Sequence, residues 1–241
     1  MGSLCVKNLC LTLEEKCILN NLSLCLPSGE LHILMGKNGA GKSSLFNAIS
    51  GICSPNSGEI SLDGESLLGL PIELIARRGI FLAFQSPIAL PGVTIAQLLR
   101  TALQARLENG ALLDHMKFYG DMHKAMDALE MPRSWATRSV NDGFSGGERK
   151  RCEILQMLLL EPRYALIDEI DSGLDVNGIR ATMAAISKMR SAGTGFLIIT
   201  HQPQHFQGLN PDRVHILSEG NIIQSGGMEL AKSVASDGFM K

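Results

Sequence analysis

The sequence has no excess of charge of either sign. Among its 241 residues, 22 Lys and Arg stand against 24 Asp and Glu, for a formal net charge of −2. Proteins that bind nucleic acid without regard to sequence need a broad basic surface, so this balance excludes that class. Charged residues make up 19% of the chain and hydrophobic residues 45%, which also excludes a chain that is disordered throughout.

Long hydrophobic runs are also missing. No stretch approaches 18 consecutive apolar residues, and runs such as residues 196–200 have the length of a strand. The sequence therefore excludes an integral membrane protein.

The cysteines lack the spacing of a ligand set. Six are present, but they form no CxxC pair and match no zinc motif, so we interpret them as small apolar side chains of a reduced protein. Residues 1–5 lack the basic and apolar segments of a secretory signal. We therefore expect a reducing, cytoplasmic compartment.

What is present is an alternation of strand-like and helix-like segments. The predicted strands are residues 4–12, 18–26, 31–35, 80–84, 164–167, 196–200, 214–217 and 222–224. The predicted helices are residues 44–50, 176–190 and the segment after a loop at 141–147, and residues 88–131 form a helical insert. A succession of strand, helix and strand favours a parallel α/β core with right-handed crossovers, here carrying a helical lobe.

A glycine-rich loop joins the strand 31–35 to the helix 44–50. It matches GxxxxGK[ST] at every fixed position, through Gly36, Lys37, Asn38, Gly39, Ala40, Gly41, Lys42 and Ser43. Its backbone N–H groups and the helix N-terminus, which includes Ser44, point at phosphate oxygens. Lys42 supplies a positive charge to the β- and γ-phosphates, and the Ser43 hydroxyl is a ligand for Mg²⁺. The sequence therefore predicts that the chain binds a nucleoside triphosphate.

Polar side chains follow three other predicted strands. Asp168 and Glu169 end the strand at 164–167, where Asp168 can hold Mg²⁺ through water and Glu169 can orient or deprotonate the attacking water. Gln85 follows the strand 80–84, and His201 follows the strand 196–200. We predict that both face the γ-phosphate, with Gln85 also a metal ligand and with Glu169, His201 and Lys42 as the catalytic residues.

A third motif opens the helix after the loop 141–147. Ser145 is a natural N-cap, and Gly146 and Gly147 leave amide N–H groups bare for an anion. An isolated Ser-Gly-Gly turn does not predict a function. Its position just before the strand that ends in Asp168 is what makes it informative.

Taken in order, these motifs together with Asp175 resemble the ATP-binding-cassette (ABC) ATPases across nearly the whole chain. The resemblance implies an α/β fold: a P-loop NTPase core whose parallel-rich sheet is flanked by helices, with an N-terminal antiparallel β subdomain. It also implies a helical subdomain at about residues 88–160 within a single domain, 1–241. Two such cassettes would hydrolyse ATP with Mg²⁺ as a head-to-tail dimer, in which Ser145, Gly146 and Gly147 contact the γ-phosphate held by the other subunit. Asp175 would bridge the two sites.

Within that family, residues 81–93, 137–157 and 167–175 resemble the SufC group, the ATPase subunits of the Suf iron–sulfur cluster assembly machinery. The group's partners are the paired scaffold proteins SufB and SufD, with no transmembrane subunit. The resemblance implies that ATP-driven dimerisation deforms or opens that scaffold. Asp171 favours this group, because the usual cassette has Pro and then Thr or Phe after the Asp-Glu pair.

Two other functions stay open. The chain could be the nucleotide-binding subunit of a membrane ABC transporter, or a switch in which ATP-dependent dimerisation matters and turnover does not. Two departures from the family pattern are Lys37, where Pro is common, and the lack of an aromatic residue for adenine near residues 14–16.

The basic cluster 149–151 is typical of a solvated helix face. A second hypothesis is that Lys150 or Arg151 pairs with Glu169 in the free subunit and keeps hydrolysis slow until partners bind.

Overall fold

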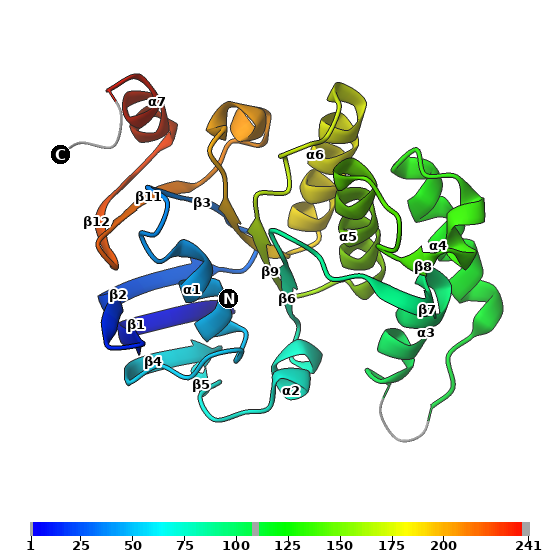
Figure 1. The fold of residues 1–241 in the computed structure, drawn as a ribbon, viewed down its shortest axis with the longest axis horizontal. Coiled ribbons are helices and arrows are strands. Elements are labelled where there is room, and N and C mark those ends of the chain that lie inside the picture. The colour runs from blue at the N-terminus through cyan, green and yellow to red at the C-terminus, as the bar shows by residue number, and fades with distance from the viewer. Residues whose placement is uncertain (1, 108–110, 238–241) are drawn as a thin grey trace.

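The computed structural model describes residues 2–107 and 111–237. Two β-sheets dominate it (Figure 1). The first is a four-stranded antiparallel sheet in the order β2-β1-β4-β5. Its strands are β1 (Ser3–Leu13), β2 (Lys16–Pro27), β4 (Ser57–Leu62) and β5 (Glu65–Ser66).

The second sheet has six strands in the order β12-β11-β3-β10-β9-β6. They are β3 (Leu31–Gly36), β6 (Ile80–Ala83), β9 (Tyr164–Asp168), β10 (Gly195–Ile199), β11 (Arg213–Ser218) and β12 (Asn221–Gly226). All neighbours pair in parallel except β12, which returns antiparallel to β11 as the edge strand. Four of the parallel strands, β3, β6, β9 and β10, therefore end at one edge, where their following loops meet.

Helices connect the strands and form a lobe at one end of the molecule (Figure 1). They are α1 (Lys42–Ile49), α2 (Ile72–Arg77), α3 (Ile95–Gln104), α4 (His115–Ala128), α5 (Gly146–Leu160), α6 (Val176–Ser191) and α7 (Met228–Asp237). Two 3-10 segments, η1 (Arg133–Thr137) and η2 (Pro203–Leu209), complete the connections, and β7 (Leu90–Thr94) pairs with β8 (Ser139–Val140). Within the described residues no helix is long and apolar enough to cross a membrane.

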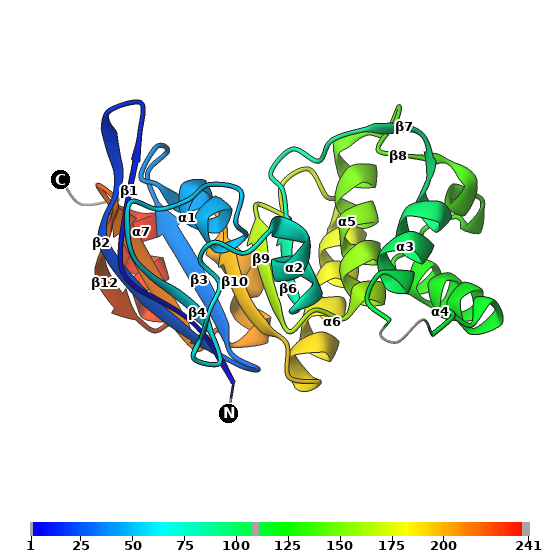
Figure 2. The ribbon, with the colours of Figure 1, turned by 90° about the horizontal axis from the view of Figure 1, so that it is seen from below.

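The two faces of the six-stranded sheet bury two different cores. On β10, Leu197 and Ile199 pack with α1 and the antiparallel sheet, whereas Phe196 and Ile198 pack with the helices of the lobe. Figure 2 shows α1 between the two sheets. Because successive strand residues face opposite sides, a strand covered on both faces is mostly apolar. Strands β3, β9 and β10 are buried along their whole length.

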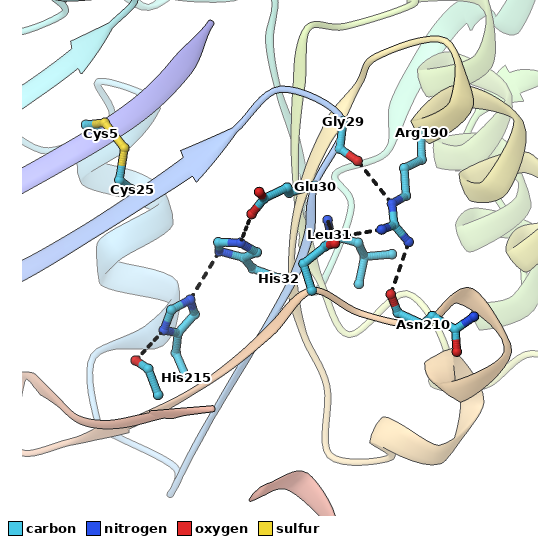
Figure 3. Close-up of polar contacts among 11 residues, drawn as sticks. Cys5, Cys25, Gly29, Glu30, Leu31, His32, Arg190, Asn210 and His215 are labelled. Atoms are coloured by element: carbon cyan, nitrogen blue, oxygen red, sulfur yellow. Dashed lines mark hydrogen bonds and ion pairs between the residues drawn. A yellow bond between two sulfur atoms is a disulfide. The ribbon is translucent and has the colours of Figure 1, made fainter. Parts of the chain in front are cut away.

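Polar side chains bridge the sheet at two places (Figure 3). His32 Nε2 lies 2.8 Å from Glu30 Oε2, His32 Nδ1 lies 3.1 Å from His215 Nε2, and His215 Nδ1 lies 2.7 Å from Ser225 Oγ. The second place is the guanidinium of Arg190, which donates to the carbonyl of Gly29 at 3.0 Å and to the carbonyls of Leu209 and Asn210. Together they join β3, β11, β12 and α6.

The expectation that the cysteines are reduced is wrong for one pair. Cys5 and Cys25 face each other in the β1–β2 register and form a disulfide, whereas Cys10, Cys17, Cys53 and Cys152 are free (Figure 3). Strand pairing placed them together, because residues 20 positions apart become direct neighbours across an antiparallel pair.

All the predicted strands and helices are confirmed within a few residues. The insert predicted at residues 88–131 is helical at α3 and α4, but it begins with the strand β7, and Leu107 lies beyond the end of α3 and is exposed. The sequence analysis missed β4, β5, α2, β7, β8 and α7. Most of these are short and lie at a surface, where weak periodicity gives no signal.

Candidate functional site

The phosphate-binding motif forms the turn between β3 and α1. Lys42 is buried, and its ammonium donates to the carbonyls of Gly36 at 2.7 Å and Lys37 at 3.1 Å, so it lies inside the curl of the loop. Two glycines are required by position. Gly41 has φ +106°, and a Cβ there would lie 2.8 Å from the Ile18 carbonyl oxygen; a Cβ on Gly36 would lie 2.4 Å from that of Leu217.

The first residue pair of the site joins this loop to β9. The Ser43 hydroxyl donates to Asp168 Oδ2 at 2.7 Å, across 125 residues of sequence. Burial raises the pKa of Asp168, and the Ser43 hydrogen bond opposes that rise. Burial lowers the pKa of Lys42, and the nearby carboxylates of Asp168 and Glu169 oppose that fall. The site therefore holds a buried ammonium and carboxylate beside a hydroxyl.

Glu169 is the centre of a second group. His201 Nε2 lies 3.1 Å from Glu169 Oε1, and Gln85 Nε2 donates to Glu169 Oε2 at 3.1 Å. The backbone of Glu169 is left-handed, with φ +53°, and its N–H donates to the Ile199 carbonyl at 3.0 Å. Three strands thus end on one carboxylate: β9 supplies it, β6 leads to Gln85, and β10 leads to His201.

All these groups line one cavity of about 590 Å³. Its lining includes ten of the residues predicted from sequence, namely Asn38, Gly39, Gly41, Lys42, Ser43, Ser44, Gln85, Asp168, Glu169 and His201. Gly36, Lys37 and Ala40 do not line it. Gly36 packs under Leu217, the Lys37 side chain is exposed, and Ala40 belongs to the core.

Lys16 and Ile18 of β2 also line the cavity, and the sequence analysis did not assign them. The weak signal available was position, because they lie in or next to the segment that lacks an aromatic residue for adenine. The half-buried Ile18 offers the only large apolar side chain in the cavity lining just described.

The anion motif at 145–147 lies outside the cavity of its own chain; its predicted contact is with the γ-phosphate held by another subunit. The Ser145 hydroxyl accepts from the Glu148 N–H at 3.3 Å, and Glu148 Oε2 accepts from the Ser145 N–H at 2.7 Å, a capping box at the start of α5. Ser145 and Gly146 are exposed, and Gly147 packs against the Gly173 carbonyl. Of the described residues that line the cavity, none belongs to this motif.

Asp175 is likewise outside the cavity lining. It caps α6, accepting from the Gly178 N–H at 2.7 Å, and pairs with Arg151 at 2.9 Å. Those bonds hold the pKa of its carboxyl below the ordinary value, first through the Gly178 N–H.

The hypothesis of a Lys150 or Arg151 contact with Glu169 is wrong. Lys150 is buried, and its ammonium donates to the carbonyls of Phe84, Gln85 and Asp168, at 2.9, 3.2 and 3.3 Å. It also pairs with the buried Glu153 at 3.4 Å, while Arg151 pairs with Asp175. The solvated face predicted for 149–151 is therefore wrong for Lys150, because α5 turns this position towards the ends of β6 and β9.

Ser43, Gln85 and Asp168 present a hydroxyl, an amide and a carboxylate to the same cavity. These are hard oxygen donors, of the type that Mg²⁺ takes together with water and phosphate oxygens. In the described ranges no three His, Cys, Asp or Glu side chains gather as a metal cluster. The donor set therefore fits a cation held jointly with a bound phosphate.

Comparisons with known proteins give the family. Residues 19–172 match the family model "ABC transporter". The chain is 43% identical over 240 residues to Vegetative protein 296 of Bacillus subtilis, covering 99% of this chain and 92% of that one. It is 40% identical over 240 residues to the "Probable ATP-dependent transporter SufC" of Escherichia coli, covering 98% and 97%.

Solved structures give the same fold. The structure of an ATP-binding subunit of an ABC transporter superposes with a TM-score of 0.82 at 26% identity, covering 98% of this chain and 95% of that chain. A bacterial ABC transporter cassette solved as a dimer also superposes with a TM-score of 0.82, at 22% identity, covering 93% and 98%.

Proposed function

Because this chain belongs to the ABC family and is an ATPase of that type, we propose that it is the energy-coupling subunit of a SufB–SufC–SufD-type iron–sulfur cluster assembly complex. The observation that carries the catalytic part is the convergence of Lys42, Ser43, Asp168, Glu169 and His201 on one cavity. The assembly role is supported by 40% identity to SufC along nearly the full length of both chains.

ATP enters the cavity with its phosphates in the loop 36–43. On binding, the Lys42 ammonium exchanges the carbonyls of Gly36 and Lys37 for phosphate oxygens, since both lie in the same curl. The base rests against Ile18 and Lys16, so it is held by an aliphatic surface rather than an aromatic stack. We therefore expect most of the affinity for the nucleotide to come from its phosphates. The site should discriminate only weakly between adenine and guanine.

Ser43, Gln85 and Asp168 are the residues that would hold Mg²⁺, Asp168 through water. The bound ion would supply positive charge that neutralises the charge developing on the phosphates. Asp168 already accepts from Ser43, so both oxygens are oriented before a ligand arrives.

Glu169 orients and deprotonates the attacking water. His201 contacts one of its oxygens and Gln85 the other, and these two contacts fix the plane of the carboxylate. The position of the carboxylate therefore depends on β9, β10 and β6. In the complex with ATP, His201 and Gln85 face the γ-phosphate next to the attacking water. Lys42 stabilises the charge on the transferred phosphoryl group.

A complete site needs a second copy of the chain. Ser145, Gly146 and Gly147 lie at the start of α5 and do not line the cavity of their own chain. Asp175, at the start of α6, pairs with Arg151 of α5. A head-to-tail pair would bring this helix N-terminus to the other subunit's γ-phosphate. We therefore propose an ATP-dependent dimer of one-domain subunits.

The proposed partners are SufB- and SufD-like scaffold proteins, in the cytoplasm. Large apolar side chains that follow β6 are exposed, with Phe84 at 43% and Ile88 at 75%, beside Gln85. Exposed apolar clusters of this kind are typical of protein contacts. A partner bound there would touch the segment that carries Gln85.

The first experiment is affinity capture with the Glu169→Gln variant and Mg²⁺-ATP, run separately on soluble and detergent-solubilised fractions. This variant is expected to bind ATP without cleaving it. Recovery of two soluble scaffold-like proteins that stimulate wild-type hydrolysis would support the assembly role. Recovery of a polytopic membrane protein would replace it with a transporter role.

Two variants control this experiment. Lys42→Ala is expected to lose nucleotide binding, so it should capture nothing in an ATP-dependent way. Full cellular activity with Glu169→Gln would mean that dimerisation alone matters and would contradict the energy-coupling role.

A further inference from the structure

Asp171 contacts the segment that carries His201 and follows Glu169 in the chain, and no role has been given to it so far. It follows Glu169 by two residues in the loop between β9 and α6, and its side chain is only 4% exposed. A buried carboxylate is costly unless it is hydrogen-bonded, so its partners indicate what the position is for.

Both partners of Asp171 come from the segment after β10. The Thr200 hydroxyl donates to Asp171 Oδ2 at 2.9 Å, and His205 Nδ1 lies 3.0 Å from the same oxygen. Since a carboxylate oxygen accepts, Nδ1 of His205 carries the proton. The Thr200 oxygen in turn accepts from the Gln202 N–H at 2.8 Å.

These contacts bracket His201. Thr200 precedes it directly and His205 follows it by four residues, so the segment is tied to Asp171 on both sides of the histidine. A backbone bond runs parallel to this tie, from the Glu169 N–H to the Ile199 carbonyl at 3.0 Å. The His201 ring and the Glu169 carboxylate, 3.1 Å apart, therefore sit on two segments that Asp171 joins.

We propose that Asp171 is a positioning residue for ATP hydrolysis, whose buried carboxylate fixes the His201 segment against the Glu169 segment. This inference rests on the proposed roles of Glu169 and His201. Asp171 is not among the residues that line the cavity, and it acts through Thr200 and His205.

Loss of this tie changes orientation rather than binding. The phosphate loop and Lys42 belong to β3 and α1 and make no contact with Asp171 among the hydrogen bonds of the described chain. Nucleotide affinity is therefore independent of Asp171, whereas the geometry around the attacking water depends on it. Displacements of about 1 Å in a catalytic group can cost about a hundredfold in rate.

The test is steady-state ATPase kinetics of Asp171→Ala, Asp171→Asn, His201→Ala and the double variant Asp171→Ala/His201→Ala. We expect Asp171→Ala to lower kcat by about 10- to 100-fold with KM for ATP within about twofold. Asp171→Asn, whose amide oxygen still accepts from Thr200, should recover part of the rate. Adding Asp171→Ala to His201→Ala should lower kcat by less than about twofold, because both changes disable the same group.

A purely structural role predicts different numbers. If Asp171→Ala reduced kcat by the same factor with and without His201, or left kcat within about twofold of wild type, the proposal would be overturned. Asp212→Ala is the matched control: Asp212 also accepts two bonds, from the Leu31 N–H and Arg190, but at the opposite edge of the sheet. It should lower Tm and leave kcat within about twofold.

Thr200→Val covers the case in which Asp171→Ala does not fold. It keeps the side-chain volume and removes the hydroxyl that donates to Asp171 and accepts from the Gln202 N–H, so kcat should fall at least about fivefold with unchanged KM. An unchanged kcat would overturn the inference. Unchanged rates in both Glu169→Gln and His201→Ala would instead overturn the proposed site itself, and the inference with it.

Discussion

At the scale of single residues, Gly41 shows how the phosphate loop depends on a missing side chain. Its φ of +106° disfavours any L side chain, and a Cβ would lie 2.8 Å from the Ile18 carbonyl oxygen. We expect Gly41→Ala to lower the free energy of unfolding by about 1–3 kcal/mol, measured by urea denaturation, and to weaken ATP binding.

Gly39→Ala is the matched control for this prediction. Gly39 also has a positive φ, +79°, but nothing lies within 4 Å of the position that a Cβ would take there. It carries the backbone strain without the collision, so its loss of stability should be clearly smaller. Equal losses in the two variants would show that the contact with β2 is unimportant.

The two buried histidines give a second prediction at this scale. Burial lowers the pKa of His215 to about 4, and it also lowers the pKa of His32 despite the hydrogen bond that His32 makes to Glu30. The Glu30 carboxylate accepts from His32 Nε2, so His32 Nδ1 accepts from His215 Nε2–H, and His215 Nδ1 accepts from Ser225. Each ring is neutral in this chain of bonds, and an added proton breaks one of them.

The sign of the pH effect follows from proton counts. Between about pH 4 and 6.5 the unfolded chain binds more protons at His215 than the folded chain, so the free energy of unfolding rises with pH. This stability is fully present above the unfolded pKa of about 6.5 and is lost as pH falls towards 4. From about pH 7 to 4.5, wild type should lose about 2 kcal/mol more than His215→Gln in urea titrations. Identical pH profiles would contradict the assignment.

At the scale of elements, α5 is held to the ends of β6 and β9 by one buried pair. Burial raises the pKa of Glu153 to about 7, although the charge of Lys150 opposes the rise, so the protein stabilises the uncharged acid. The Lys150 ammonium donates hydrogen bonds to three backbone carbonyls. The two members of the pair should therefore respond unequally to mutation.

We expect Lys150→Met to lower the free energy of unfolding by about 3 kcal/mol, because it removes the positive charge beside buried Glu153 and leaves three carbonyls without their donor. Glu153→Gln should cost less than about 1 kcal/mol, since a neutral amide can still accept from the Phe84 N–H that Glu153 now binds at 2.9 Å. Chemical denaturation measures both. A larger loss in Glu153→Gln than in Lys150→Met would contradict this interpretation.

At the scale of the whole molecule, the proposed site residues lie in two parts of the fold. Residues at the carboxyl edge of the central sheet line the cavity. Helix α5 belongs to the helical lobe (Figures 1 and 2). In the head-to-tail dimer proposed above, a second subunit would close the γ-phosphate side.

We expect Glu169→Gln to double in mass when Mg²⁺-ATP is added, measured by light scattering during size-exclusion chromatography. ADP should leave the mass unchanged, because the proposed contact from Ser145 is with the γ-phosphate. The combination Glu169→Gln/Lys42→Ala is the control and should not respond to ATP. A dimer whose stability ignored the nucleotide would count against the head-to-tail arrangement.

The sequence by itself determined the features that depend on neighbours along the chain. The order of strands and helices, the phosphate loop and the capping box of Ser145 with Glu148 each need only a few consecutive residues. The strand-end positions of Gln85, Asp168 and His201 follow in the same way, because parallel strands bring their carboxyl ends to one edge.

Only the tertiary structure decided which distant side chains meet. The Cys5–Cys25 bond, the burial of Lys150 against Glu153, the place of Ile18 in the cavity and the tie from Asp171 to Thr200 and His205 all depend on strand register and helix rotation. A one-residue slip of a strand, or about a quarter turn of a helix, would replace every one of these partners without altering the local pattern. Local sequence sets the elements, and packing energy summed over the two cores sets how they meet.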